Sequence, residues 1–236
     1  MDGPLSYWFV RYRSPHETDH LRLRIHLPDP DRYAAYTVAV GNWARRLRHE
    51  GVLGRLAFDT YRPEIGRYGH GPAIWAAEAV FAADSRAVAA GLRGLPAALI
   101  NPHALAAVSM VDIAHGFLGS LTDATGWLTA RPAPATTTAD RTAAEQAVHW
   151  AADGAPREVA GWPDTVVDAW QARAAALSGY RRALPADADT DAVLEALLHM
   201  HHNRALGVDV DREATCRRLA RQAALAWQAQ RNRRDR

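Results

Sequence analysis

Four positively charged or imidazole side chains alternate along one short segment, at a spacing that could bind an anion. Segment 20–27 alternates leucine or isoleucine with polar residues, as a β-strand with two different faces does. Its polar side carries His20, Arg22, Arg24 and His26. Residues two positions apart on a strand project to the same side, about 7 Å apart, so Arg22 and Arg24 could hold a carboxylate. A solvated outer face of a sheet has the same pattern.

A second segment, 62–71, combines three glycines and one proline with charged side chains. Glycine lets a backbone approach a ligand closely, and Glu64 and Arg67 are the charged pair that such a loop would present. An ordinary ion pair on the surface is the alternative.

A third segment contains His199, His201 and His202 near the end of a predicted helix over 190–206. His199 shares a helix face with His202 or with Asn203, but not with His201. Imidazole titrates near neutral pH, so one of these histidines could transfer a proton, whereas a buried structural histidine fits the pattern as well. Zinc usually needs a third protein ligand, and none is evident, so we predict no metal site.

The composition excludes several mechanisms. The chain has 236 residues with 28 basic and 26 acidic side chains, a net charge of +2, and no lysine. Schiff-base chemistry on lysine and a P-loop are therefore excluded. A single cysteine excludes an internal disulfide and favours a cytoplasmic protein. No apolar run of about 18 residues predicts a membrane span, and the near-neutral charge argues against a dedicated nucleic-acid binder.

The elements that must position these residues indicate an α+β fold with a small N-terminal sheet in the order β-β-α-β. We expect strands over 7–13, 20–27 and 52–60, with a helix over 31–50 between the second and third. Helices are predicted over 72–93, 103–129, 140–152, 164–182, 190–206 and 211–231. The segment 131–138 reads as a linker between an α/β part (1–130) and a helical part (139–236) of one domain (1–236).

In this order, four segments resemble the C-terminal elimination domain of lantibiotic dehydratases and of thiopeptide-type bacteriocin biosynthesis proteins. They are Trp8–Arg13, His20–Arg24, Tyr61–Gly69 and His199–Arg204. The resemblance implies a lyase in the biosynthesis of ribosomal peptide natural products. That enzyme removes glutamate from glutamylated Ser or Thr and leaves dehydroalanine or dehydrobutyrine, and it needs no cofactor.

The same resemblance implies roles for single residues. Arg22, Arg24 and Arg67 would bind the leaving glutamate and stabilise the enolate. His201, with His199 as the second choice, would transfer the proton, and Glu64 would orient an arginine or assist that transfer.

The implied partners are a ribosomally made precursor peptide and a separate glutamylating enzyme that uses glutamyl-tRNA. The family strand begins here at residue 8, so we expect a short, stand-alone domain, with an exposed sheet edge that favours a homodimer. The main alternative is a pyridine synthase that joins two dehydroalanines by a formal [4+2] cycloaddition with loss of the leader peptide. A non-catalytic subunit that binds the precursor peptide is a second alternative, and a metal hydrolase is a weaker one.

Overall fold

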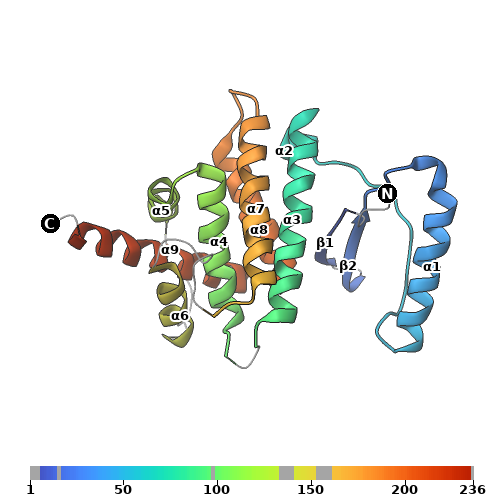
Figure 1. The fold of residues 1–236 in the computed structure, drawn as a ribbon, viewed down its shortest axis with the longest axis horizontal. Coiled ribbons are helices and arrows are strands. Elements are labelled where there is room, and N and C mark those ends of the chain that lie inside the picture. Colours follow the sequence, from blue (N-terminus) through green and yellow to red (C-terminus); the bar gives the residue numbers. More distant parts are fainter. Residues whose placement is uncertain (1–5, 15–16, 97–98, 133–140, 153–160, 235–236) are drawn as a thin grey trace. The chain divides into compact units, whose positions relative to one another are not determined.

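The computed structural model of the chain describes residues 6–14, 17–96, 99–132, 141–152 and 161–234. Two strands at the N-terminus are followed by helices (Figure 1). The elements are β1 (Tyr7–Ser14), β2 (Glu17–Ile25), a 3-10 turn (Pro30–Arg32), α1 (Tyr33–His49), α2 (Ile65–Tyr68), α3 (Pro72–Gly94), α4 (Pro102–Leu118), α5 (Leu121–Ala130), α6 (Arg141–Ala152), α7 (Asp164–Ala183), α8 (Thr190–Leu206) and α9 (Val210–Arg234). The two strands pair antiparallel, and the predicted α+β class is confirmed.

The chain separates into two compact units. The smaller comprises the N-terminus up to Tyr7 and Arg24–Pro63, and the larger comprises Trp8–Leu23 and Glu64–Arg236. The smaller unit contains α1 and the segment that follows it, and the larger contains α2 to α9 and most of the hairpin. The division between 1–130 and 139–236 stays a prediction, and most of the linker at 131–138 lies outside the described residues.

The predicted third strand over 52–60 is wrong. This segment has no regular secondary structure, and the described sheet contains only β1 and β2. Its start is bound to the end of α1 instead: the N–H groups of Val52 and Leu53 both donate to the carbonyl of Leu47, at 2.9 and 3.2 Å. Val52 and Phe58 are 71% and 56% exposed. Apolar alternation therefore did not produce a strand, because a strand also needs a neighbour with which to pair.

The predicted helix over 103–129 is two helices, α4 and α5, which meet at an angle of 119°. Gly119 ends α4 with a φ of +87°, a conformation that favours glycine. The side chain of Ser120 then caps α5 by accepting from the N–H of Asp123 at 3.0 Å. A glycine followed by serine at residues 119 and 120 is thus sufficient to turn the chain.

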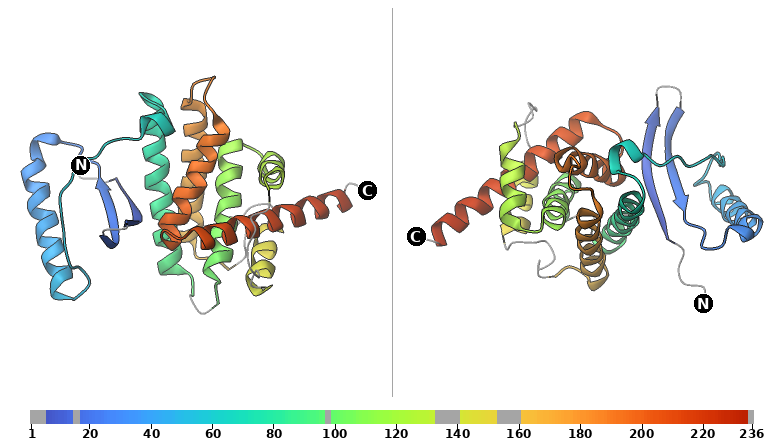
Figure 2. Two further views of the ribbon diagram at one scale, coloured as in Figure 1. Left: turned by 180° about the vertical axis from the view of Figure 1, so that it is seen from behind. Right: turned by 90° about the horizontal axis from the view of Figure 1, so that it is seen from above.

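Helices α3, α4, α7 and α8 form the core of the larger unit, and α9 crosses them (Figure 2). Gly116 on α4 shows how closely two of them pack: a Cβ there would lie 3.2 Å from the Cα of Ala174 on α7. Among the described residues no single helix is long and apolar enough to span a membrane, although the bent pair α4 and α5 passes that test when the two are taken together.

A cluster of charged side chains lies inside this apolar core. Asp84 on α3 accepts from Arg173 on α7 at 2.8 Å, from Arg204 on α8, and from His201 at 2.9 Å. Arg173 also donates to Asp112 on α4 at 3.0 Å. The five residues are at most 3% exposed. The cluster is neutral overall, because two arginines balance two aspartates. An unbalanced charge would be costly at a buried position.

This cluster also fixes the N-terminal hairpin to the helices. Arg204 donates through Nε to the carbonyl of Phe9 on β1 at 2.8 Å, and Ser85, the neighbour of Asp84, accepts from the N–H of Phe9 at 3.1 Å. Both groups belong to the edge of β1 that faces away from β2. Side chains from α3 and α8 thus supply the hydrogen bonds that a further strand would have made.

Asp84→Asn should destabilise the larger unit strongly, because Arg173 and Arg204 would keep their charges without a carboxylate between them. We expect the free energy of unfolding in urea to fall by about 3–5 kcal/mol. Asp168→Asn, at an exposed position on α7, is the matched control and should change it by less than about 0.5 kcal/mol. Equal stability of the two variants would contradict the role given to Asp84.

Candidate functional site

Arg22 and His20 lie on the side of the sheet that carries the buried residues of β1. The guanidinium of Arg22 lies 3.5 Å from the centre of the Tyr12 ring, and its Nε lies 3.4 Å from Nε2 of His20. Tyr12 projects to the same side as Trp8 and Val10, which are both 7% exposed. The polar side of β2 therefore lies on the same side of the hairpin as Trp8 and Val10, although Arg22 itself is exposed. The apolar side of β2 is exposed as well: Leu21 is 64% and Leu23 is 40% exposed.

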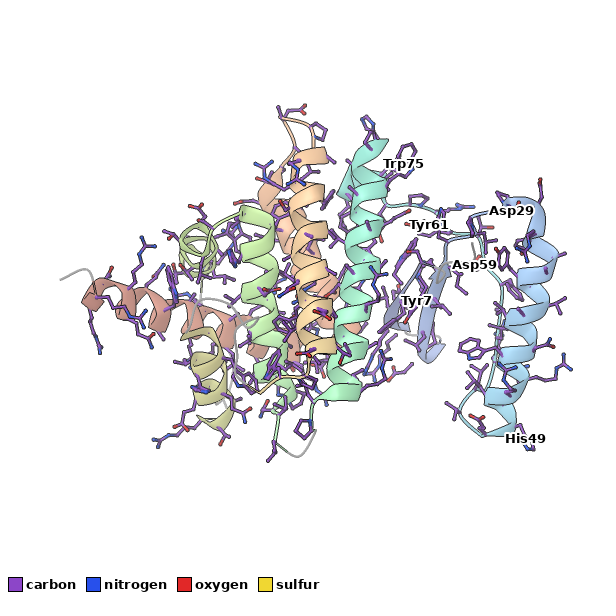
Figure 3. All side chains as sticks on the ribbon, viewed as in Figure 1. Tyr7, Asp29, His49, Asp59, Tyr61 and Trp75 are labelled. Atoms are coloured by element: carbon purple, nitrogen blue, oxygen red, sulfur yellow. The ribbon has the colours of Figure 1, made fainter. Side chains whose placement is uncertain are left out.

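Arg24 belongs to the smaller unit. Its guanidinium lies 5.5 Å from the centre of the Tyr61 ring, and Figure 3 labels Tyr61. Such a contact attracts the guanidinium to the face of the ring. A joint role of Arg22 and Arg24 stays a prediction.

Glu64 and Arg67 form an ion pair at 3.0 Å on the short helix α2, and both side chains are about half exposed. The neighbouring Tyr68 anchors this helix. It is 2% exposed, packs edge-on against Phe81 with ring centres 4.9 Å apart, and its carbonyl accepts from the hydroxyl of Tyr180 at 2.9 Å. The core thus holds the charged pair in place at the surface.

A glycine is required directly after α2. Gly69 has a φ of +87°, and a Cβ there would lie 2.8 Å from the side chain of Ala73. A larger residue in place of Gly69 would therefore clash, because α2 approaches the start of α3 closely at this point.

His199 is the half-exposed histidine of the cluster, with 45% of its side chain accessible. Its Nδ1 lies 2.8 Å from the carboxylate of Glu213 on α9, and its Nε2 lies 2.9 Å from the amide of Asn203, one turn along α8. Because a carboxylate can only accept, Nδ1 carries a proton and Nε2 has the lone pair in the neutral ring. The predicted shared face of His199 and Asn203 is confirmed.

Glu213 is fixed as an anion. Burial raises the pKa of its carboxyl, but hydrogen bonds and charges from His199 and Arg217 outweigh this and lower it from 4.5 to about 2. Nε of Arg217 donates to Glu213 at 2.9 Å, so the carboxylate oxygens are divided between the imidazole and a guanidinium.

His201 is an interior residue, 2% exposed, and its Nδ1 faces the Asp84 carboxylate. Burial lowers the pKa of this imidazole, although Asp84 opposes the shift. Burial alone would raise the pKa of Asp84, yet His201, Arg204 and Arg173 hold it well below its ordinary range. We therefore assign a neutral imidazole that donates from Nδ1 to an ionised Asp84. His202 is buried as well, and burial lowers its pKa too.

The hairpin, α2 and the second half of α8 converge in the larger unit. Helix α2 packs against α3 and α8, and the Tyr68 hydroxyl lies within electrostatic reach of both Arg67 and Arg204. Burial raises the pKa of Tyr68 to about 12, so this hydroxyl stays protonated. Trp8 meets Phe81 with ring centres 6.5 Å apart, beside Tyr68. Arg22, Arg67 and His199 are thus carried by elements that share one packed core.

Sequence reasoning missed Asp84, Asp112 and Arg173, and it also missed Glu213. The first three gave a signal: each is a charged residue inside a helix rich in alanine and other apolar residues, where an unpaired charge is costly. Glu213 gave none, because it is one acidic residue in a highly charged helix. In the described part of the chain, no three His, Cys, Asp or Glu side chains are grouped so as to hold a metal ion.

The contact between His199 and Glu213 predicts an acid-sensitive contribution to stability. The pKa of Glu213 is lowered on folding, so its contribution is present above pH 4.5 and is lost as the pH falls towards 2. Urea unfolding of wild type between pH 6 and pH 2.5 should therefore show a steeper loss of stability than Glu213→Gln. Parallel curves for the two proteins would contradict the assignment.

Comparison with known proteins identifies the family. A family model described as lantibiotic biosynthesis dehydratase C-term matches residues 2–224. Subtilin biosynthesis protein SpaB of Bacillus subtilis is 34% identical over 85 residues, which are 36% of this chain and 8% of that protein.

A solved structure shows the same fold. The tRNA dependent lantibiotic dehydratase MibB from Microbispora sp. 107891 has a TM-score of 0.74 with 22% identity, over 98% of this chain and 25% of MibB. The chain therefore spans only a fraction of either relative. With nearly its whole length matched by the family model, the chain belongs to the lantibiotic biosynthesis dehydratase C-terminal family.

Proposed function

We propose that this chain catalyses the elimination of glutamate from glutamylated Ser or Thr in a ribosomally made precursor peptide. The observation that carries the proposal is the half-exposed His199, whose ring is held by Glu213 of α9. His199 belongs to α8, and this helix packs against α2, which carries Arg67. Removal of an α-proton with loss of an anion requires an accessible base and positive charge that stabilises the developing anion, and His199 and Arg67 are the accessible groups of these two kinds that we assign. MibB is described as tRNA dependent. This supports a tRNA-dependent step that prepares the ester, and we assign that step to a glutamylating partner.

In the reaction, Nε2 of His199 accepts the proton from Cα of the esterified residue. The electron pair of that C–H bond forms the Cα=Cβ double bond, the bond from Cβ to the ester oxygen breaks, and glutamate leaves as a carboxylate. The products are a dehydroamino acid, free glutamate and an imidazolium. Glu213 stabilises that imidazolium through Nδ1, and the amide of Asn203 must yield Nε2 to the substrate.

Arginines would bind the charge that develops. The leaving glutamate carries two carboxylates, and guanidinium groups bind carboxylates in a planar, two-pronged geometry. Arg67 is oriented by Glu64 at 3.0 Å, and Arg22 is held over the Tyr12 ring. We assign the leaving carboxylates and the enolate oxygen to Arg22 and Arg67, and orientation of Arg67 to Glu64. A part for Arg24, which belongs to the smaller unit, rests on the family resemblance alone.

His199 replaces His201 as the preferred residue for proton transfer. A peptide substrate can reach a side chain that is 45% exposed, whereas His201 is buried and already donates to Asp84. In our proposal His201 supports the structure of the larger unit, and its neutral ring belongs to the Asp84 cluster.

The activity itself can be tested with a synthetic peptide that carries one glutamylated serine. We expect wild type to release glutamate and form dehydroalanine, detected by mass spectrometry. Arg67→Ala should slow this by about 100- to 1,000-fold, because a charge that stabilises the transition state is lost, whereas Arg181→Ala on the exposed face of α7 should not.

Other results would favour the alternatives. Consumption only of a peptide with two dehydroalanines would indicate a pyridine synthase, and tight binding without any mass change would indicate a binding subunit. Either result overturns the proposed elimination.

The two histidines can be distinguished by identical substitutions. His199→Gln should lower the elimination rate by about 100- to 10,000-fold, with the free energy of unfolding close to that of wild type. His201→Gln should instead lower the free energy of unfolding and keep the rate at a temperature where the variant is folded. The reverse pattern would return the proton-transfer role to His201.

A further inference from the structure

A largely apolar cavity of about 200 Å³ lies in the larger unit, and neither His199 nor Arg67 lines it. Its walls are the second half of α3, the first half of α4, Trp170 and Arg173 on α7, and the end of α8 from His201 onward. Leu92 both lines the cavity and is 64% exposed, so the cavity reaches the surface beside this residue. An apolar cavity of about 150 Å³ in another protein stays dry and binds benzene, so this one has room for a larger molecule.

Among the described residues that line the cavity, two side-chain polar atoms are buried without a hydrogen bond: Nε2 of His201 and Nε of Arg173. His201 lines this cavity, while its other nitrogen, Nδ1, faces Asp84, which does not line it. Nε2 is therefore the nitrogen on the cavity side. A buried polar atom without a hydrogen bond is costly, which favours a ligand that supplies one.

The charge state of the wall decides what kind of ligand fits. Nδ1 donates a hydrogen bond to the Asp84 carboxylate, so Nε2 presents a lone pair. A ligand that pairs with Nε2 must therefore bring an N–H or O–H donor. The charge of Arg173 is already matched by Asp84 and Asp112 at 2.8 and 3.0 Å. A carboxylate ligand would add an unmatched anion to an apolar space, and a cationic one would face Arg173. The ligand is therefore neutral.

We propose that this cavity binds a neutral aromatic molecule of the size of indole or phenol, with its N–H or O–H group donating to Nε2 of His201. The aliphatic side chains of α3 and α4 would cover its ring, and Trp170 supplies an aromatic wall against which such a ring can pack edge-on. This binding does not depend on the proposed elimination activity.

The test uses indole as the probe and indene, which has the same shape but no N–H group, as its control. Each is titrated into the full chain and binding is followed by calorimetry and by NMR of isotope-labelled methyl groups. We expect indole to bind about 3- to 10-fold more tightly than indene, the value of one hydrogen bond. The methyl signals of Leu92 and Leu105 at the cavity should shift, and that of Leu23 on β2 should not.

A matched pair of substitutions locates the site. Ala106→Leu places a larger side chain in the cavity and should weaken indole binding at least tenfold, whereas Ala172→Leu on the exposed face of α7 should leave it unchanged. If Ala106→Leu does not fold, the methyl shifts of the wild type decide alone. Absence of indole binding up to its solubility limit, equal affinity for indene, or shifts away from the cavity would each overturn the proposal.

Discussion

One buried carboxylate, that of Asp84, organises the larger unit. It lies in an apolar helix and remains charged because Arg173, Arg204 and His201 surround it with donors from two other helices. Removing a carboxylate from water is costly, so those donors must stay where they are. The cluster therefore fixes the mutual placement of α3, α7 and α8, and through Arg204 and Phe9 it also fixes the first strand.

That constraint gives His199 and His201 of α8 opposite environments, although they are two residues apart. A step of two residues on a helix turns the side chain by about 200°, so His201 enters the Asp84 cluster and His199 turns towards α9. There Glu213 determines which nitrogen of His199 carries the proton. One helix thus supplies a structural imidazole in the interior and an accessible one at the surface.

The hairpin shows why the pattern of a strand does not determine which side of it is buried. The alternation in β2 suggested that the leucines face the core, yet Leu21 and Leu23 are exposed, while Arg22 shares the side of the buried Trp8 and Val10. Trp8 of β1 packs against Phe81 of α3, and this contact determines which side of β1 faces the helices. Arg22 therefore lies over the Tyr12 ring on the side of the hairpin that carries Trp8 and Val10, with its side chain exposed.

The α+β class and the ranges of most helices could be predicted from the sequence, because periodicity, caps and glycine positions are local properties. The order of four motifs was enough to indicate the family. The sequence also identified Arg22, Arg67 and His199 as candidates. The break between α4 and α5 is local too, since Gly119 and Ser120 make it. The packing of distant segments, by contrast, settled that 52–60 is not a strand and that His201 is buried. The tertiary structure also revealed Glu213 as the partner of His199. Each of these outcomes depends on which distant segment becomes a neighbour in space, and the local sequence pattern does not encode that.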